Sequence, residues 1–377
     1  MTTEIHGYCD PRFAPMRQAF TANFEQGLEL GASLALTWQG ASVVDLWAGW
    51  ADRAQTRPWE ENTLVPVAST TKVAMTISML LLLDRGLIEL DAPIARYWPE
   101  FAQGGKDQVT IRDALTHQAG VPGFAEPVSF EQLCDWDYIT ARIAAEPHWY
   151  GGERRITYHN QTYGFPLGEV LRRVDGRKPA QFFREEIAGP LDCDFHMALT
   201  DPAEMARLAE LRPPLPGDLP PAGSLLSKLV TSVSQGDRGS WLARSSDVPA
   251  GNGVANGRAI ARLTSIMAMQ GTLNGRTWLS ADLARASATQ QAYGQCPYLD
   301  WVAFGLGFGL SSDAFAYPSP TTYGWGGFGG SWALMDPATG VSLGYAPSNF
   351  SIWGYRVDPR LARIGEALSQ VLADLGS

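Results

Sequence analysis

Apolar runs at the two ends of the chain have the length and spacing of β-strands, whereas the apolar stretches between them have the spacing of helices. Near the N-terminus, residues 32–38 and 43–48 are apolar runs joined by the four residues 39–42. Two such runs with a short glycine-containing connection predict a β-hairpin. Near the C-terminus, glycine-rich turns separate three more strand-like runs, at 304–310, 331–335 and 341–346.

One predicted helix differs from the others because nearly every position in it is apolar. It runs from Thr70 to Arg85, and Gly86 ends it. A helix without a polar face belongs in the interior of a protein, so we expect this one to be central and buried. A proline-rich stretch at 212–223 is expected to be an ordered surface loop. Helical spacing also predicts helices at 111–116, 162–174, 179–188, 258–270 and 359–375.

The order of these elements, with strands at both ends and helices between them, predicts an α/β (α+β) fold. Terminal strands of this kind usually pair into one sheet, and the helical part is then an insertion. The length of 377 residues fits one large domain or two closely packed ones.

Composition argues against several classes of function. A net charge of −10 without a basic stripe speaks against a nucleic-acid partner. No apolar run reaches the ~18 residues of a membrane span, and residues 1–13 lack the basic and apolar regions of a secretory signal. The cysteines are isolated, which fits reduced thiols in a cytoplasmic protein. The histidines have no metal-ligand spacing, so we expect neither a metal nor another cofactor.

Ser69 and Lys72 form a Ser-x-x-Lys stretch at the start of the predicted central helix. Residues three apart share one helical face, and Ser69 would lie near the free N–H groups of the first turn. Burial against an apolar helix lowers the pKa of a lysine, and a neutral amine can accept a serine proton. The alternative is an N-cap serine followed by an ordinary lysine. The chain contains only three other lysines, which are Lys106, Lys178 and Lys228.

Two further segments carry candidate chemistry. Tyr158 could relay a proton if a lysine lies nearby, and Asn160 could hold that lysine through a side-chain hydrogen bond. A tyrosine whose hydroxyl is satisfied locally is the alternative. The glycine-rich segment 323–331 directly precedes a predicted strand, where glycines permit close approach to a ligand. A plain turn between two strands would have the same composition.

Taken in order, these three segments resemble the Ser-x-x-Lys, Tyr-x-Asn and Lys-Thr-Gly motifs of serine β-lactamases and penicillin-binding proteins. The chain more closely resembles the family VIII carboxylesterases of that superfamily, over nearly its whole length. The resemblance implies a β-lactamase/transpeptidase-like fold with a central antiparallel sheet. It further implies a discontinuous sheet domain (1–82 and 175–377), an inserted, mainly helical domain (83–174) and an active site at their junction.

The resemblance also implies roles for individual residues. Ser69 would be the acylated nucleophile, Lys72 its proton acceptor, Tyr158 a second acid or base, and Asn160 the residue that orients Lys72. The backbone N–H groups of Ser69 and Phe328 would form the oxyanion hole. Candidates for the substrate pocket are Trp325, Gly326, Gly327, Tyr150, Trp149 and Trp332.

The third motif departs from that of the β-lactamases, because no lysine follows Lys228 in the chain. The positive charge that those enzymes place near a substrate carboxylate is therefore missing, and Trp325 cannot replace it. We expect a serine carboxylesterase that acts on short-chain or small aromatic esters. Acyl transfer, weak β-lactamase or D-amino-acid amidase activity, and an inactive binding scaffold remain alternatives. The expected partner is a small-molecule ester; a homo-oligomer is possible, and no nucleic acid or membrane is expected.

Overall fold

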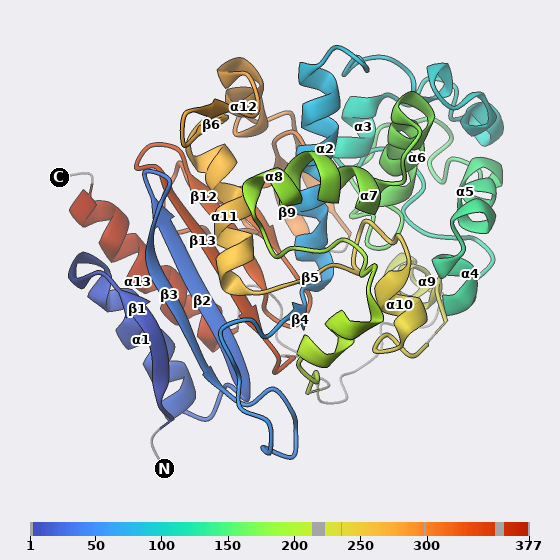
Figure 1. Ribbon diagram of the computed structural model, residues 1–377. Helices are drawn as coiled ribbons and strands as arrows, with labels where there is room; N and C mark the ends of the chain where they lie inside the picture. The colour runs from blue at the N-terminus through green and yellow to red at the C-terminus, as the bar shows by residue number, and fades with distance from the viewer. Residues whose placement is uncertain (1–2, 213–222, 235, 298, 351–357, 376–377) are drawn as a thin grey trace.

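The computed structural model describes residues 3–212, 223–234, 236–297, 299–350 and 358–375 (Figure 1). Within these residues nine strands form one sheet, in the order β1-β3-β2-β13-β12-β11-β10-β9-β8, and every neighbouring pair is antiparallel. The strands are β1 (Ile5–Cys9), β2 (Gly31–Trp38), β3 (Ala41–Gly49), β8 (Ala292–Cys296), β9 (Asp300–Phe304), β10 (Gly309–Leu310), β11 (Tyr323–Gly326), β12 (Trp332–Asp336) and β13 (Val341–Pro347).

The two ends of the chain meet in this sheet. Strand β2 pairs with β13, so that Leu36 lies opposite Leu343 although about three hundred residues separate them. The expectation that the terminal strands form one sheet is confirmed. The predicted hairpin is also confirmed, with a turn at Gln39 and Gly40, whose φ angles of 51° and 78° suit a tight two-residue connection.

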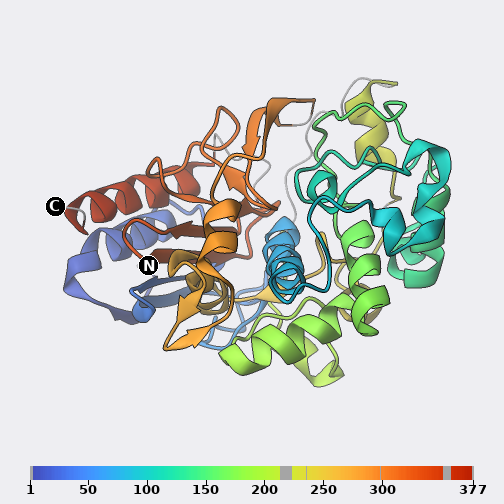
Figure 2. The same cartoon turned by 90° about the horizontal axis from the view of Figure 1, so that it is seen from above.

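Helices cover both faces of the sheet. On one face, α1 (Ala14–Glu25) and α13 (Pro359–Leu375) pack side by side, and Figure 2 shows them together on that side. On the other face, α11 (Gly257–Ala268) crosses β13, β2 and β12, and α2 (Thr71–Asp84) lies between the sheet and the helical part of the chain. The described residues therefore form three layers, with the sheet between two sets of helices. Helix α2 lies between the sheet and the helical part of the chain.

Shorter helices make up most of the remaining structure. Where helices were predicted, the differences are confined to one or two residues at the ends, except that 179–188 is an α-helix continued by a wider π-turn over Arg184–Ala188. Among the described residues, none of the helices combines the length and the apolar character needed to cross a bilayer. The helices not yet located are α3 (Ile111–Leu115), α4 (Phe130–Cys134), α5 (Trp136–Ala145), α6 (Gly164–Asp175), α7 (Pro179–Phe183), α8 (Gly189–Leu191), α9 (Leu225–Thr231), α10 (Trp241–Ser245) and α12 (Ala281–Ser287).

Two sequence predictions need comment. The strand predicted at 304–310 is wrong as one unit, because the chain turns back at 305–308 and divides it between β9 and β10. Most of the loop predicted at 212–223 lies outside the described residues.

Helix α11 approaches the sheet closely because glycines lie at the crossing. A Cβ atom on Gly344 would lie 2.1 Å from the Gly257 carbonyl oxygen and 2.5 Å from the Ala261 nitrogen. A Cβ on Gly257 would lie 2.9 Å from the carbonyl oxygens of both Gly344 and Ser33. These neighbours are backbone atoms that cannot rotate away, so any side chain at position 344 would push α11 off the sheet.

We therefore expect Gly344→Val to lower the free energy of unfolding by about 1–3 kcal/mol through overpacking. The measurement is chemical denaturation followed by circular dichroism. Gly365→Ala is the matched control, because its Cβ would meet Trp332 at an ordinary 3.5 Å and alanine favours the helix. A Gly344→Val variant as stable as the wild type would show that α11 does not depend on this contact.

Candidate active site

Ser69 lies at the entrance to α2, in a single 3₁₀ turn formed by Ala68–Thr70. Ala68 has a φ of 45°, a left-handed conformation that costs free energy in a residue other than glycine. Thr71 holds this turn, because its hydroxyl donates to the Ala68 carbonyl (2.6 Å) and accepts the N–H of Gly253 (2.8 Å). The turn therefore fixes the position of the buried Ser69 side chain.

The amine of Lys72 is buried among oxygen atoms, and only 1% of the residue is exposed. Its Nζ lies 3.1 Å from Ser69 Oγ and 2.9 Å from each of the carbonyl oxygens of Asn160 and Ala250. Burial lowers the pKa of Lys72 well below its usual value, which favours the neutral amine. A neutral amine has two N–H groups for the two carbonyls and one lone pair, which is then free to accept the Ser69 proton.

The side chain of Tyr158 also contacts Ser69, although 89 positions separate the two residues in the sequence. Its hydroxyl donates to Ser69 Oγ over 2.7 Å, and its ring lies 4.9 Å from Lys72 Nζ. The backbone N–H of Tyr158 donates to Cys296 Sγ in β8 (3.3 Å), which ties this segment to the edge of the sheet. The structure thus brings together Ser69, Lys72 and Tyr158, the three side chains to which the sequence assigned chemistry.

Asn160 contacts Lys72 differently from the prediction. The expected side-chain hydrogen bond is wrong, because it is the backbone carbonyl of Asn160 that accepts from Nζ. The neighbouring His159 is fully engaged with the backbone: its Nδ1 donates to the Thr157 carbonyl (2.6 Å) and its Nε2 accepts the N–H of Val121 (3.2 Å). Burial lowers the pKa of His159 to about 4. A neutral imidazole with both nitrogens occupied has a structural role.

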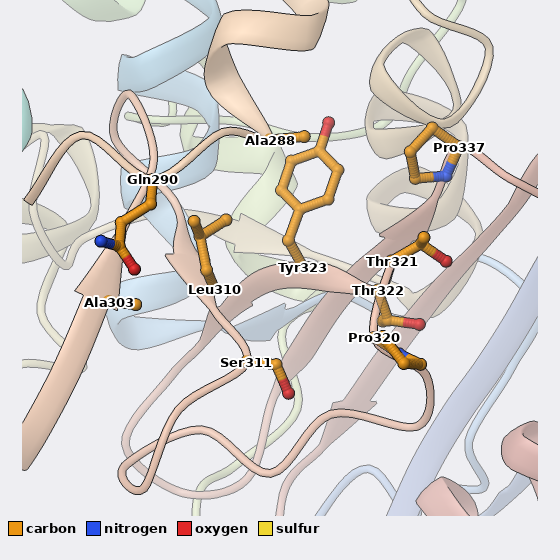
Figure 3. Close-up of a pocket in the computed structure, with 10 residues that line it drawn as sticks. All are labelled: Ala288, Gln290, Ala303, Leu310, Ser311, Pro320, Thr321, Thr322, Tyr323 and Pro337. Atoms are coloured by element: carbon orange, nitrogen blue, oxygen red, sulfur yellow. The ribbon is translucent and has the colours of Figure 1, made fainter. Parts of the chain in front are cut away.

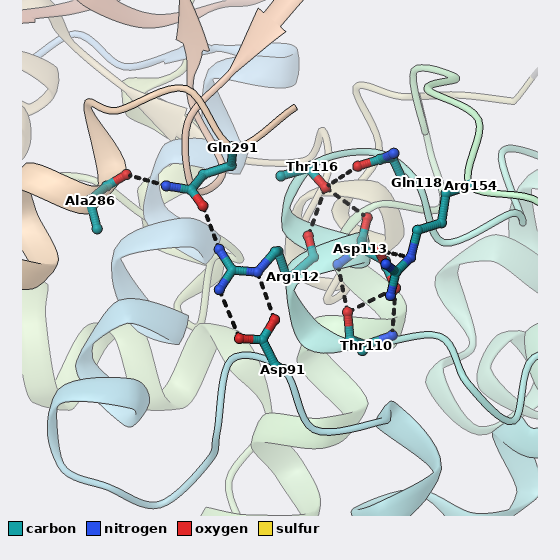
Figure 4. A network of polar contacts seen from close by, with 9 residues as sticks. All are labelled: Asp91, Thr110, Arg112, Asp113, Thr116, Gln118, Arg154, Ala286 and Gln291. Atoms are coloured by element: carbon teal, nitrogen blue, oxygen red, sulfur yellow. Dashed lines mark hydrogen bonds and ion pairs between the residues drawn. The ribbon is translucent and has the colours of Figure 1, made fainter. Parts of the chain in front are cut away.

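Polar contacts hold the segment that leads to Tyr158 against α3 (Figure 4). Arg154 pairs with Asp113 (3.0 Å), whose carboxylate also accepts from Thr110 and caps the start of α3. Arg112 pairs with Asp91 (2.7 Å) and also donates to Gln291, just before β8. This network connects α3, the chain before Tyr158 and the edge of the sheet.

The glycine-rich segment lies directly against the turn that carries Ser69. The hydroxyl of Ser331 contacts the Val67 carbonyl oxygen (2.7 Å), just before that turn, and Thr70 Oγ1 (2.9 Å), at its end. A Cβ on Gly327 would lie 2.2 Å from the Val67 oxygen, so only glycine fits there. The N–H of Phe328 makes no hydrogen bond to another described residue. The role of Phe328 in an oxyanion hole stays a prediction.

Trp325 lies behind Tyr158 instead of lining an open pocket. It is 2% exposed, and its ring lies 5.6 Å from that of Tyr158 and 5.5 Å from that of His117. Its indole N–H has no hydrogen-bond partner among the described residues.

His117 was missed as a site residue by the sequence analysis. It is buried and accepts the N–H of His159 (3.1 Å), and burial lowers its pKa well below the usual value.

Of the other predicted pocket residues, Tyr150 and Trp149 are half-buried and bonded to neighbours, whereas Trp332 is buried. Tyr150 shares a hydrogen bond with Thr157 (2.6 Å), one residue before Tyr158, and the Trp149 indole donates to Glu146 (3.1 Å). Trp332 is buried in β12 among the residues that α1 and α13 cover. Contact of Tyr150 and Trp149 with a substrate stays a prediction.

Residues from the C-terminal part of the chain line a depression of about 300 Å³ (Figure 3). It includes Tyr323 from the glycine-rich segment but neither Ser69, Lys72 nor Tyr158, so we do not assign the chemistry to it. The lining residues are Ala288, Gln290, Ala303, Leu310, Ser311, Pro320, Thr321, Thr322, Tyr323 and Pro337.

Three potential metal ligands, Asp194, His196 and Glu204, lie close together in the described chain. Arg207 pairs with both carboxylates, and His196 contacts Asp194 over 2.8 Å. These contacts account for the cluster as an ion-pair network.

With this geometry established, comparison with known proteins identifies the family. The family model described as Beta-lactamase matches residues 20–364. The chain belongs to the beta-lactamase family. Among curated relatives, the esterase/beta-lactamase LipL of Mycobacterium tuberculosis is 33% identical over 358 residues, which cover 90% of this chain and 82% of LipL.

Two solved structures are similar over nearly the whole chain. A penicillin-binding protein homologue from Caulobacter crescentus has a TM-score of 0.88 and 36% identity, covering 98% of this chain and 100% of that one. A family VIII carboxylesterase has a TM-score of 0.88 and 34% identity, with the same coverage. The expected β-lactamase/transpeptidase-like fold is confirmed, and the chain is a serine hydrolase of that fold.

Lys72→Arg tests the amine as a base. Arginine keeps its charge because its pKa lies above ~12, so it cannot accept the Ser69 proton. We expect kcat/KM for an ester to fall by about 10²–10⁴-fold. Kinetics of purified variants would measure this fall, with thermal melting as the check on folding.

Lys106→Arg is the matched control for Lys72→Arg. Lys106 is also buried and donates to backbone carbonyls, including those of Gln103 (2.7 Å) and Ala144 (3.1 Å), but it contacts no proposed catalytic residue. Its substitution should alter stability and leave kcat/KM unchanged. Equal losses of activity in both variants would contradict the role of Lys72.

Proposed function

We propose that this member of the beta-lactamase family is a serine carboxylesterase that hydrolyses small, uncharged esters through an acyl-Ser69 intermediate. The observation that carries the proposal is the double contact on Ser69 Oγ, from Lys72 Nζ at 3.1 Å and from Tyr158 Oη at 2.7 Å. A serine with a potential base and a potential acid on one oxygen is arranged for nucleophilic catalysis. This arrangement counts against an inactive binding scaffold.

In the first half-reaction, Ser69 Oγ attacks the ester carbonyl while the neutral amine of Lys72 takes its proton. The negative charge on the carbonyl oxygen is stabilised by the N–H groups of Ser69 and Phe328. As the tetrahedral intermediate collapses, the bond to the alcohol breaks and Tyr158 or protonated Lys72 gives the leaving oxygen a proton. Ser69 then carries the acyl group as an ester.

In the second half-reaction, water attacks the acyl-enzyme. Either the neutral Lys72 amine or, where Tyr158 gave up its proton in the first half-reaction, the Tyr158 phenolate takes one proton of that water, and the same two N–H groups stabilise the second tetrahedral intermediate. When the bond to Ser69 Oγ breaks, the serine oxygen regains a proton and the carboxylic acid leaves. The overall reaction consumes one water and releases one alcohol and one acid.

The charge around the site supports an uncharged substrate. The sequence has no lysine after Lys228, and the third segment contributes Trp325, a buried and neutral side chain. A substrate carboxylate placed there would lose water without gaining a cation. The family VIII carboxylesterase and the mycobacterial esterase/beta-lactamase support ester hydrolysis, and the second name keeps a weak β-lactamase activity as a second candidate.

Ser69→Ala tests the nucleophile and the reaction class together. We expect the wild type to hydrolyse p-nitrophenyl butyrate and Ser69→Ala to lose at least ~10³-fold in kcat/KM. A phosphonate ester should add covalently to Ser69, as peptide mass spectrometry would detect. Full activity in Ser69→Ala would sink the mechanism. Turnover of a chromogenic cephalosporin at a comparable rate would favour the lactamase instead, and ester formation on addition of methanol would indicate acyl transfer.

A matched pair of esters tests the preference for uncharged substrates. We expect kcat/KM for p-nitrophenyl hexanoate to exceed that for p-nitrophenyl hydrogen adipate by at least ~10-fold, because the adipate chain ends in an unpaired carboxylate. Both rates are corrected for spontaneous hydrolysis. Equal kcat/KM values for the two esters would mean that a cation of the protein binds the substrate carboxylate.

A further inference from the structure

A buried arginine from the C-terminal helix lies beneath the loop Gly327–Gly330, which connects β11 to β12. Arg360 is 2% exposed, and its guanidinium donates to the Gly329 carbonyl oxygen over 2.9 Å. A Cβ on Gly330 would lie 2.5 Å from the same Arg360 nitrogen, so loop and guanidinium are in direct contact. This loop contains Phe328, yet Arg360 follows it in sequence by about thirty residues.

Every N–H group of Arg360 has an acceptor. Nε and Nη2 bind the two oxygens of Asp358 (3.1 and 2.8 Å), Nη1 binds the Asn349 carbonyl (2.6 Å) and Glu29 (3.3 Å), and the remaining Nη2 hydrogen binds Gly329. The five donors of a guanidinium are therefore all used. Such a planar group, fixed on several sides, cannot rotate away from the loop.

Two buried carboxyl groups face Arg360. Tyr345 donates to Glu29, and burial raises the pKa of Glu29 to about 8, whereas the neighbouring guanidinium acts in the opposite direction. Arg360 contacts Asp358 (2.8 Å) and Glu29 (3.3 Å) in buried ion pairs. Burying an ion pair costs desolvation free energy, and a buried pair is by itself weak evidence of a stabilising role. Because Arg360 also donates to the Gly329 carbonyl, its effect on the loop Gly327–Gly330 is the more informative property.

The loop itself needs an external contact to stay in one conformation. Gly329 and Gly330 follow Phe328 with φ angles of 100° and 101°, a region in which glycine moves freely. On the side of the nucleophile, Gly327 N–H donates to the Ser331 carbonyl (2.8 Å) and Gly330 N–H to the Gly327 carbonyl (3.0 Å). The bond from Arg360 to Gly329 fixes the other side.

We infer that Arg360 is a positioning residue for catalysis: by holding the Gly329 carbonyl, it fixes the loop so that the Phe328 N–H points to the reacting carbonyl oxygen. Asp358 and Glu29 orient the guanidinium. The inference rests on the proposed esterase function and on Phe328 as an oxyanion donor. A donor in an oxyanion hole acts mainly on the transition state, so displacement of the loop should lower kcat and leave KM nearly constant.

Arg360→Gln is the test variant and Arg363→Gln its matched control. Arg363 lies one turn further along α13 and donates to Asn23 of α1 and to Gln26, which follows that helix, away from the loop. For Arg360→Gln we expect kcat for p-nitrophenyl butyrate to fall by about 10–100-fold with KM within about twofold. The inhibition constant of an alkyl boronic acid, which mimics the tetrahedral intermediate, should rise by the same factor. Arg363→Gln should change neither quantity.

A folded Arg360→Gln variant with kcat within about twofold of the wild type would overturn the inference, as would a lower kcat with unchanged boronic acid affinity. If Arg360→Gln does not fold, Arg360→Lys carries the test, because lysine keeps a cation beside Asp358 but offers fewer donors. It should show the same selective loss of kcat, and an unchanged kcat would overturn the inference. An inactive wild type, or an active Ser69→Ala, would instead refute the proposed function.

Discussion

The site depends on one desolvated amine. Lys72 lies in a helix whose other buried positions are apolar or small polar residues, so its charged form would lose water without gaining a counter-ion. The two carbonyls that accept its hydrogens, those of Asn160 and Ala250, come from segments about ninety residues apart. The helical part of the chain and the segment before α11 must therefore both close on α2 before Lys72 has its partners.

The same requirement explains the close packing around Ser69. The turn at Ala68 is strained, and Thr71, Gly253 and Ser331 hold it from two sides. Strain of this kind persists only where the surroundings over-determine the conformation. The glycines at 327, 329 and 330 let β11 and its loop approach Ser69 more closely than side chains would permit.

The strands β2, β3, β12 and β13 and the main catalytic candidates could be predicted, because their signals are local, whereas β1, β8 and β11 were missed. A lysine on an apolar helix, three residues after a serine, is visible in the sequence and pointed to the nucleophile. The contact from Asn160 could not be predicted correctly, because every residue has a backbone carbonyl and its direction depends on tertiary structure. His117 and Arg360 were missed for a similar reason. Their importance lies in neighbours that are distant in sequence, and no periodicity marks them.

The pKa of Lys72 and the charge that the site favours in a substrate have a common physical cause. A second cation near Lys72 would lower the pKa of Lys72 further by repulsion. In an enzyme with such a cation, that cation can also bind an anionic substrate. In this chain burial is the cause that lowers the pKa of Lys72. Burial therefore favours the neutral amine without the help of a second cation, and no lysine follows Lys228 to supply a positive charge for a carboxylate. For Lys72 as the proposed base, the desolvation that lowers its pKa also disfavours charged substrates, which connects the helix around Lys72 with Trp325 in the glycine-rich segment.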